Sequence, residues 1–224
     1  MNKRHRPPSQ ARLTWVLPLS AAVLTVAAAC YPSGVDSITD YNTVSTFYDT
    51  AFADGGFKGL STYSIPGATP ANPSSCVIKD LDGGAIVTSP NVSTVCNTVV
   101  NQLDVLGYSL VPSNNPTAPS FVVTIAFVSQ TYSGWVSYPW YGYWGSYYPG
   151  YPWYGWGYYY PTYSYSYDVG TLALQMAVPD TVNSRMNGVW GAAINGVDTA
   201  PNNTPAVIQN LVVQAFTQSP YLGK

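Results

Sequence analysis

Few side chains of this 224-residue chain have the types needed for acid–base or nucleophilic chemistry. Glutamate is absent, ten aspartates are scattered along the chain, and the single histidine is His5. A hydrolase needs a base beside its nucleophile, and after His5 only Lys58 or Lys79 could pair with a serine in that way. No recognisable motif surrounds either lysine. We therefore expect the chain not to be an enzyme.

The aspartates suggest two further kinds of site. Asp80-Leu81-Asp82-Gly83-Gly84 partly matches a calcium loop but lacks the later ligands, especially a bidentate glutamate. A polar turn is the simpler interpretation, and we predict no metal and no cofactor. Glycosidases work with two carboxylates, so a glycan-binding or glycan-processing enzyme that uses aspartates is the alternative function.

Residues 131–167 form an aromatic insertion with a composition unlike the rest of the chain. The segment holds 14 of the 20 tyrosines and five of the seven tryptophans, and it contains no charged residue and no histidine. Such a segment can stack, bury ring surface and hydrogen-bond, but it cannot act as a base. Its candidate binding residues are Trp135, Trp140, Tyr141, Trp144, Trp153, Tyr154 and Trp156.

Three interpretations of the aromatic insertion remain open. It can be a self-packed loop that folds over the sheet. It can be a binding surface for an envelope protein or a glycan, because Tyr and Trp are enriched at binding hot spots. It can also be an aromatic belt at a membrane interface.

The N-terminal residues predict export and lipid anchoring. A basic start is followed by an apolar run over 13–29 and then by Cys30, the order expected of a secretory signal. Val26-Ala27-Ala28-Ala29-Cys30 resembles the lipobox of bacterial lipoproteins, which implies cleavage after Ala29 and acylation of Cys30. The other interpretation is an ordinary signal peptide with Cys30 as a bystander. Tyr31 stands where a retention signal would have aspartate, so we expect an outer-membrane location in the cell envelope.

Charge and cysteine content limit what the exported chain can bind. Residues 30–224 contain four basic residues and ten aspartates, a formal net charge of −6. That surface lacks the basic patch needed for nucleic acid, so we expect the membrane, reached through the lipid anchor, and an envelope protein or glycan as partners. Cys76 and Cys96 are a candidate disulfide in an oxidising compartment.

The elements that would position these residues follow from periodicity and end signals. Thr43–Asp49 and Lys58–Ile65 are predicted strands. Ser89-Pro90 and Thr204-Pro205 each place an N-cap hydroxyl before a proline and predict helices that end at Gly107 and at Ser219-Pro220. Between the helices we predict three strands, over Ser120–Val128, Thr171–Val178 and Gly188–Val197, the last two as a hairpin.

This order predicts an α+β fold with a mainly antiparallel sheet and two helices packed on one face. The aromatic insertion would be a long hairpin between the first two of the three strands. We expect a signal peptide over 1–29, a lipidated cysteine and tether over 30–42, and a single domain over 43–224.

The mature chain resembles the bacterial lipoproteins of the DUF4136 family. The matching features, in order, are Ser37–Asp49, Thr62-Tyr63-Ser64-Ile65-Pro66, Leu106-Gly107-Tyr108, Phe121–Phe127, the Gly/Tyr-rich insertion, Gly170-Thr171-Leu172, Val189-Trp190-Gly191 and Ser219-Pro220-Tyr221. Family members often pair an acidic with a basic residue near the penultimate strand, and Asp180 and Arg185 correspond to that pair here. The resemblance implies a lipoprotein with an α+β fold and no established activity.

Overall fold

The computed structural model describes residues 43–80, 85–89, 91–128, 132–135, 151, 157–159, 164–167, 170–197 and 204–223, with only the backbone described for 132–135, 157–159 and 164–167. The predicted signal peptide, Cys30 and the tether lie outside these residues.

Three long antiparallel strands form the centre of the sheet. They are β5 (Phe121–Val128), β9 (Thr171–Asp180) and β10 (Arg185–Ile194), with β9 in the middle. Nearly every residue of β5 and β9 is buried, as expected for strands covered on both faces. The three predicted strands and the hairpin between the last two are confirmed.

The sheet is mixed, so the prediction of a mainly antiparallel sheet is wrong. Among the described residues it contains eight strands, in the order β1-β10-β9-β5-β2-β4, with β3 beside β5 and β7 beside β10. Strand β1 (Val44–Tyr48) joins β10 antiparallel. Four short strands pair in parallel: β2 (Thr62–Ser64), β3 (Lys79–Asp80), β4 (Ser109–Leu110) and β7 (Gly157–Tyr159).

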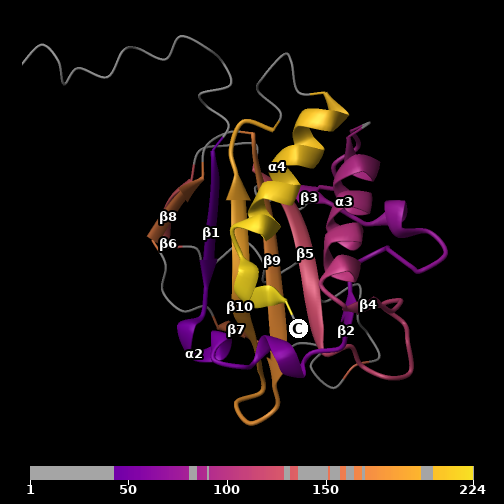
Figure 1. The fold of residues 1–224 in the computed structure, drawn as a ribbon, viewed down its shortest axis with the longest axis vertical. Helices are drawn as coiled ribbons and strands as arrows, with labels where there is room; N and C mark the ends of the chain where they lie inside the picture. Colours follow the sequence, from indigo (N-terminus) through magenta and orange to yellow (C-terminus); the bar gives the residue numbers. More distant parts are fainter. Residues whose placement is uncertain are drawn as a thin grey trace, which may run out of the picture. The chain divides into compact units, whose positions relative to one another are not determined.

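Two long helices pack against each other and lie over the same face of the sheet (Figure 1). They are α3 (Val92–Val105) and α4 (Pro205–Thr217). A short helix, α2 (Thr50–Ala53), and the 3-10 turns η3 (Phe57–Gly59), η4 (Pro73–Ser75) and η6 (Pro220–Leu222) connect the larger elements.

The two predicted helix starts have different outcomes. Thr204 caps α4 as predicted, since its side chain accepts a hydrogen bond from the Val207 N–H and Pro205 is the first helical residue. Helix α3 begins later than predicted, with Asn91 rather than Ser89 at the cap position. Ser89 instead forms a turn before the helix, in which its hydroxyl accepts from the Asn91 N–H at 3.3 Å.

Gly107 ends α3 for a clear backbone reason. Its φ of 89° lies in the left-handed region, which a residue without Cβ adopts without strain. The Tyr108 N–H then reaches the Leu103 carbonyl at 3.0 Å, and the Gly107 N–H reaches the Asp104 carbonyl at 2.9 Å. These two bonds form a Schellman motif and satisfy carbonyls that the helix end would leave unpaired.

The predicted strand over Lys58–Ile65 is largely wrong. Its first residues form the 3-10 turn η3, and only Thr62–Ser64 are extended as β2. Gly55 precedes the turn with a φ of 102°, which glycine adopts without strain, and Gly59 is the last residue of the turn. Helix α2 was not predicted either; Asp49 caps it by accepting from the Ala51 N–H at 2.9 Å.

The main core fills the space between the helices and one face of the sheet. We call this the helix face. Its side chains are apolar and, apart from Ala192, large: Phe121, Val123, Ile125 and Phe127 of β5, Leu172, Leu174, Met176 and Val178 of β9, and Trp190, Ala192 and Ile194 of β10. Trp190 is 1% exposed and its indole N–H donates to the Ser219 hydroxyl at 2.9 Å. Its predicted place in the core is confirmed.

Candidate functional site

The opposite face of the same strands is built from small and polar residues. We call it the small-residue face. It comprises Val122, Thr124, Ala126 and Val128 of β5, Thr171, Ala173, Gln175 and Ala177 of β9, and Gly191 and Ala193 of β10. All of its side chains are buried, although α3 and α4 lie over the other face (Figure 1). Small side chains leave room for large groups to pack against the strands.

Two polar side chains lie at the centre of the small-residue face. Thr124 and Gln175 are register partners across β5 and β9, and they are 0% and 3% exposed. Among the described residues, the Thr124 hydroxyl has no hydrogen-bond partner. A buried hydroxyl without a partner costs roughly 1–3 kcal/mol, so this position is an energetic defect in an otherwise well-packed sheet.

Phe47 of β1 covers part of this face. It is the register partner of Gly191, and a Cβ atom added at Gly191 would overlap the Phe47 ring. The absence of a side chain at Gly191 therefore lets an aromatic ring lie directly on the backbone of β10.

The described backbone of the aromatic insertion contributes three strands. Strands β6 (Tyr132–Trp135) and β8 (Ser164–Tyr167) pair antiparallel with each other in a separate two-stranded sheet. Strand β7 joins the main sheet beside residues 185–187 of β10. Strand β7 could not be predicted from the sequence, because a segment composed almost wholly of aromatic residues and glycine has no polar alternation to mark a strand.

Tyr151 is the one residue between β6 and β7 whose side chain the structure describes. It is 7% exposed, and its hydroxyl donates to the Asn115 carbonyl at 2.8 Å. Burial raises the pKa of its phenol above the usual value of 10.0. Tyr151 was not among the predicted binding residues, since nothing in the sequence distinguishes it from the other tyrosines of the insertion.

Most of the predicted binding residues lie outside the described part of the chain. Trp135 falls within β6, where only the backbone is described. The structure does not describe the other six candidates, which are Trp140, Tyr141, Trp144, Trp153, Tyr154 and Trp156.

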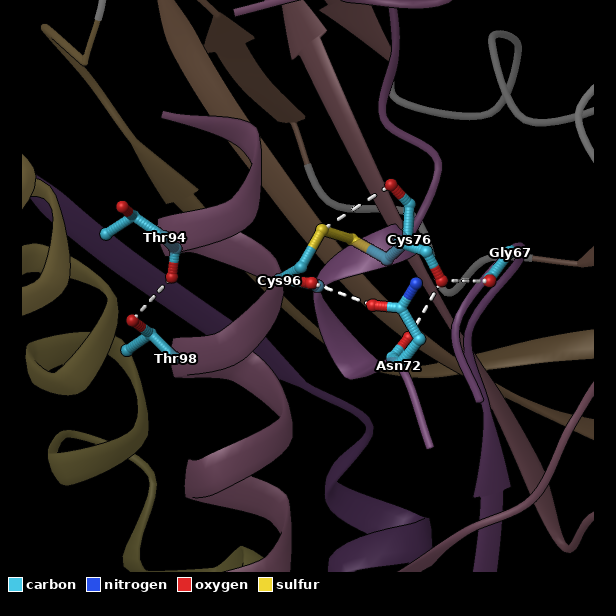
Figure 2. The surroundings of a disulfide bond; sticks show 8 residues. Gly67, Asn72, Cys76, Thr94, Cys96 and Thr98 are labelled. Atoms are coloured by element: carbon cyan, nitrogen blue, oxygen red, sulfur yellow. Dashed lines mark hydrogen bonds between the residues drawn. A yellow bond between two sulfur atoms is a disulfide. The ribbon is translucent and has the colours of Figure 1, made fainter. Parts of the chain in front are cut away.

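A disulfide joins Cys76 to Cys96, with a Cα–Cα distance of 5.7 Å. Figure 2 shows Cys96 on α3 and Cys76 in the segment that follows η4. The preceding turn is held by the Ser75 hydroxyl, which donates to the Gly67 carbonyl at 2.6 Å. In the chain-entropy model a loop of this length stabilises the fold by about 3 kcal/mol. The bridge therefore attaches η4 to the helix that covers the core.

Asp180 and Arg185 form an ion pair at the turn between β9 and β10, with 3.3 Å between Asp180 Oδ2 and Arg185 Nε. The Asp180 carboxylate also accepts from the Asn183 side chain at 2.7 Å, from the Asn187 side chain at 3.2 Å and from the backbone N–H of Val182 and Asn183. Hydrogen bonds from Asn183, first of all, lower the pKa of Asp180 to about 2. The Asp180 carboxylate therefore stabilises the turn between β9 and β10.

Two other carboxylates also have structural partners. Asp49 caps α2, as described above. Asp104 accepts from the Tyr63 hydroxyl at 3.2 Å. Desolvation by burial, followed by the nearby Asp104 charge, raises the pKa of Tyr63 well above 10.0. These contacts stabilise the fold.

A cleft of about 440 Å³ lies where β3, the 85–89 segment and the first turn of α3 meet the ends of β5 and β9. Its walls are mainly apolar and include Val87, Val92, Val95, Phe127 and Leu172. Asp80, Thr88, Ser89 and Asn91 add polar groups to the lining. Asp80 was predicted to lie in a polar turn, and the cleft could not be predicted because its walls come from segments distant in the chain.

Within the described ranges, potential metal ligands do not gather in groups of three or more. None of the helices in these ranges is both long and apolar enough to cross a membrane.

Residues 44–221 match the family model described as "Domain of unknown function (DUF4136)". The chain belongs to the DUF4136 family. The resemblance inferred from the order of motifs is therefore confirmed, and it covers nearly all of the described domain. No protein of curated function matches the chain.

The solved structure of another family member shares the fold. A DUF4136 family protein from Bacteroides thetaiotaomicron is 21% identical, with a TM-score of 0.57, over 82% of this chain and 98% of its own. Two structures of the PelC dodecamer from Paraburkholderia phytofirmans are 13% identical, with TM-scores of 0.35, over 82% of this chain and 98% and 99% of theirs.

Proposed function

We propose that this member of the DUF4136 family is a lipid-anchored lipoprotein of the bacterial cell envelope with a non-catalytic binding or structural role. The non-catalytic role is supported by the structural contacts that the described aspartate carboxylates make. Asp49, Asp104 and Asp180 each accept hydrogen bonds that cap a helix, fix a buried tyrosine or close a turn. Groups committed to such contacts are poorly placed to transfer protons to a substrate.

The anchoring part of the proposal rests on the N-terminal sequence. The apolar run over 13–29 and the lipobox-like residues before Cys30 support cleavage and acylation at Cys30. Two or more acyl chains suffice for stable membrane attachment. Tyr31 in place of aspartate supports the outer membrane as the destination.

The contact part of the proposal concerns the aromatic insertion. Its described pieces are attached to the domain, through β7 on β10 and through the Tyr151 hydroxyl on Asn115. The buried small-residue face supports a hairpin insertion that lies against it with some of its rings. The remaining rings, among them those of the candidate tryptophans, would present an uncharged surface for an envelope protein or a glycan.

The alternative is a glycan-binding or glycan-processing protein. Uncharged aromatic rings stack well on sugar faces, which favours glycan binding. Glycan hydrolysis normally needs two carboxylates, and Asp80 is the only one among the described residues that line the cleft. Binding is therefore the better-supported half of this alternative.

Membrane fractionation of Cys30→Ser tests the anchor. We expect the protein to move from the membrane fraction to the soluble fraction, because the acyl chains carry the membrane affinity. Cys76→Ser is the matched control, since it removes a cysteine of the folded domain and should leave the protein on the membrane. Unchanged membrane association of Cys30→Ser would refute lipid anchoring.

Affinity capture from detergent-solubilised membranes tests the contact surface. The variant should carry Trp140→Ser, Trp144→Ser, Trp153→Ser and Trp156→Ser, and it should keep Tyr151 and β7. We expect cooperative unfolding to persist while a partner captured by the wild type is lost. Loss of cooperative unfolding would instead assign these rings to the core.

A further inference from the structure

The disulfide between Cys76 and Cys96 lies within the apolar core, between α3 and the segment after η4 (Figure 2). Cys96 is 0% exposed and Cys76 is 4% exposed. Both belong to the same cluster of buried side chains as Val99 and Leu103 of α3. A protein that exchanges disulfides must bring its own sulfur into contact with the sulfur that it attacks. Burial in the completed fold prevents that contact at this bridge.

The segments that enclose the bridge come later in the chain than the two cysteines. Helix α3, which carries Cys96, packs against α4, and the core cluster that contains the bridge includes side chains of β5, β9 and β10. These four elements lie within residues 121–217. A chain led across a membrane by an N-terminal signal emerges in sequence order, so Cys76 and Cys96 reach the outside before the segments that cover them.

The two cysteines can meet before the rest of the domain has formed. They are 20 residues apart in the chain, and in an open chain a loop of about ten residues closes in roughly 10–100 ns. The turn before Cys76 is held by a local hydrogen bond from the Ser75 hydroxyl to the Gly67 carbonyl at 2.6 Å. A reduced cysteine is a small apolar side chain that a core accommodates. Folding ahead of oxidation would therefore enclose two unjoined thiols.

We propose that a thiol–disulfide oxidoreductase of the cell envelope joins Cys76 to Cys96 while the chain is still open, before residues 121–217 complete the core. The inference rests on the proposed export of the chain. It gives the protein a transient partner, namely a protein with a reactive disulfide. It also explains why the bridge persists, because the burial that excludes the oxidant from the folded domain excludes reductants of similar size.

The exchange proceeds in two steps and transfers two electrons and two protons to the oxidoreductase. In the first step, one cysteine thiolate of the chain attacks a sulfur of the oxidoreductase disulfide. That bond breaks, a mixed disulfide forms, and the other sulfur of the oxidoreductase leaves as a thiolate. In the second step, the remaining cysteine thiolate attacks the chain's own sulfur in the mixed disulfide. The Cys76–Cys96 bond forms, and the oxidoreductase leaves as a dithiol.

Cys30 affects the outcome, because it is the third cysteine of the chain. A free thiol at Cys30 would compete in the second step and give wrong pairings. Diacylglycerol transfer at the proposed anchor turns the Cys30 sulfur into a thioether, which has no thiolate and takes no part in exchange. We therefore expect Cys76 and Cys96 to be the only exchangeable pair of the acylated chain.

Reduction of the native bridge in the full, acylated protein tests its shielding. The protein in detergent is treated with reduced thioredoxin, with and without urea, and mass spectrometry of the cysteine-containing peptides follows the reaction. We expect reduction of the folded protein to be at least about 1,000-fold slower than reduction of the unfolded chain, because thioredoxin reaches the bridge only in the rare open state.

Val105→Cys, capped with glutathione at the new cysteine, is the matched control. Val105 is on the same helix as Cys96 and is 80% exposed. Thioredoxin should therefore remove the cap at similar rates from the folded and the unfolded protein, while the bridge in the same molecules stays closed in the folded one.

A second measurement tests the order of oxidation and folding. Oxidised protein disulfide isomerase is added to the reduced protein either at the start of refolding or after refolding is complete. We expect the bridge to form at least about tenfold more slowly in the second case, because the folded domain encloses the thiols and opens rarely. A reduced chain that does not fold also supports the proposed order, since oxidation must then come first.

The outcomes separate this inference from the proposed function. Reduction of the native bridge at the rate of the glutathione cap overturns the inference. Equal rates of oxidation before and after refolding, in a protein that folds when reduced, also overturn it. The same mass spectra report the state of Cys30. A Cys30 without an acyl group in protein from native membranes overturns the lipid anchor and leaves the result for the bridge intact.

Discussion

The two faces of the central strands are both buried, but they are built from different side chains. The helix face carries Leu172, Leu174 and Met176 along β9, whereas the small-residue face of the same strand carries Ala173, Gln175 and Ala177. Large apolar side chains meet two helices whose own apolar stripes fill the space between them. Small side chains instead leave space that large groups fill by packing directly on the strand backbone, as the Phe47 ring does over Gly191.

This difference teaches that burial and stabilisation are distinct properties. The helix face removes large apolar surfaces from water, at roughly 25 cal/mol per Å². The small-residue face buries polar groups as well, and the hydroxyl of Thr124 has no partner in the part of the chain that the structure describes. We therefore expect the two faces to respond differently to substitution, even at adjacent positions of one strand.

The largest contrast is expected at adjacent positions of β10. Trp190→Ala removes a side chain that is 1% exposed on the helix face and should cost about 3–5 kcal/mol. Gly191→Ala adds a methyl group on the small-residue face where the Phe47 ring lies, and overpacking should cost about 1–3 kcal/mol. Denaturant unfolding measures both. A smaller loss for Trp190→Ala than for Gly191→Ala would show that the small-residue face carries the tighter packing.

A second contrast, with opposite signs, is expected at adjacent positions of β5. Val123→Thr places a hydroxyl among the apolar groups of the helix face and should destabilise the fold by about 1–3 kcal/mol. Thr124→Val removes the unpartnered hydroxyl and keeps the shape, so it should be neutral or stabilise by up to about 1 kcal/mol. Both substitutions keep a β-branched residue, so strand propensity is matched. Destabilisation by Thr124→Val would mean that the hydroxyl has a partner essential to this face.

The smallest effect is expected beyond both faces, at the β9–β10 turn. Hydrogen bonds lower the Asp180 pKa from 3.8 to about 2, so the folded state favours the ionised carboxylate. Its contribution is fully present above pH 3.8 and is lost as pH falls towards 2. The melting-temperature difference between wild type and Asp180→Asn should therefore shrink over that interval. A difference that stays constant with pH would assign the effect of Asp180→Asn to geometry alone.

A companion variant tests the cause of this shift. Asn183→Ala removes the side-chain donor that contributes most to it, so the pKa of Asp180 should move back towards 3.8. An NMR titration of the carboxyl carbon measures this directly. An unchanged pKa would assign the shift to the remaining donors of the turn.

Periodic and chemically marked features could be predicted from the residues alone. The apolar stripe from Val92 to Leu103, the proline after Thr204 and the left-handed glycine at 107 identify the two long helices. The strands β5, β9 and β10 have enough residues for their composition and turn signals to identify them. The order of these motifs also identified the family.

Features that depend on long-range contacts could not be predicted in this way. Strands β3 and β4 have only two residues each, too few to show a period of two, and their parallel pairing is decided by where the chain returns to the sheet. The same holds for the cleft, whose walls join Val87, Val95 and Leu172 from three elements.

The sequence by itself determined the family, the long helices and strands, and the small number of side chains suited to catalysis. Each of these follows from local spacing or from composition. Only the tertiary structure decided that the sheet is mixed, that its two faces differ, that Asp180 holds a turn and that an apolar cleft lies beside α3. The physical reason is that pairing and burial depend on which distant segments meet, and the free energy of those contacts is not encoded in any single stretch of residues.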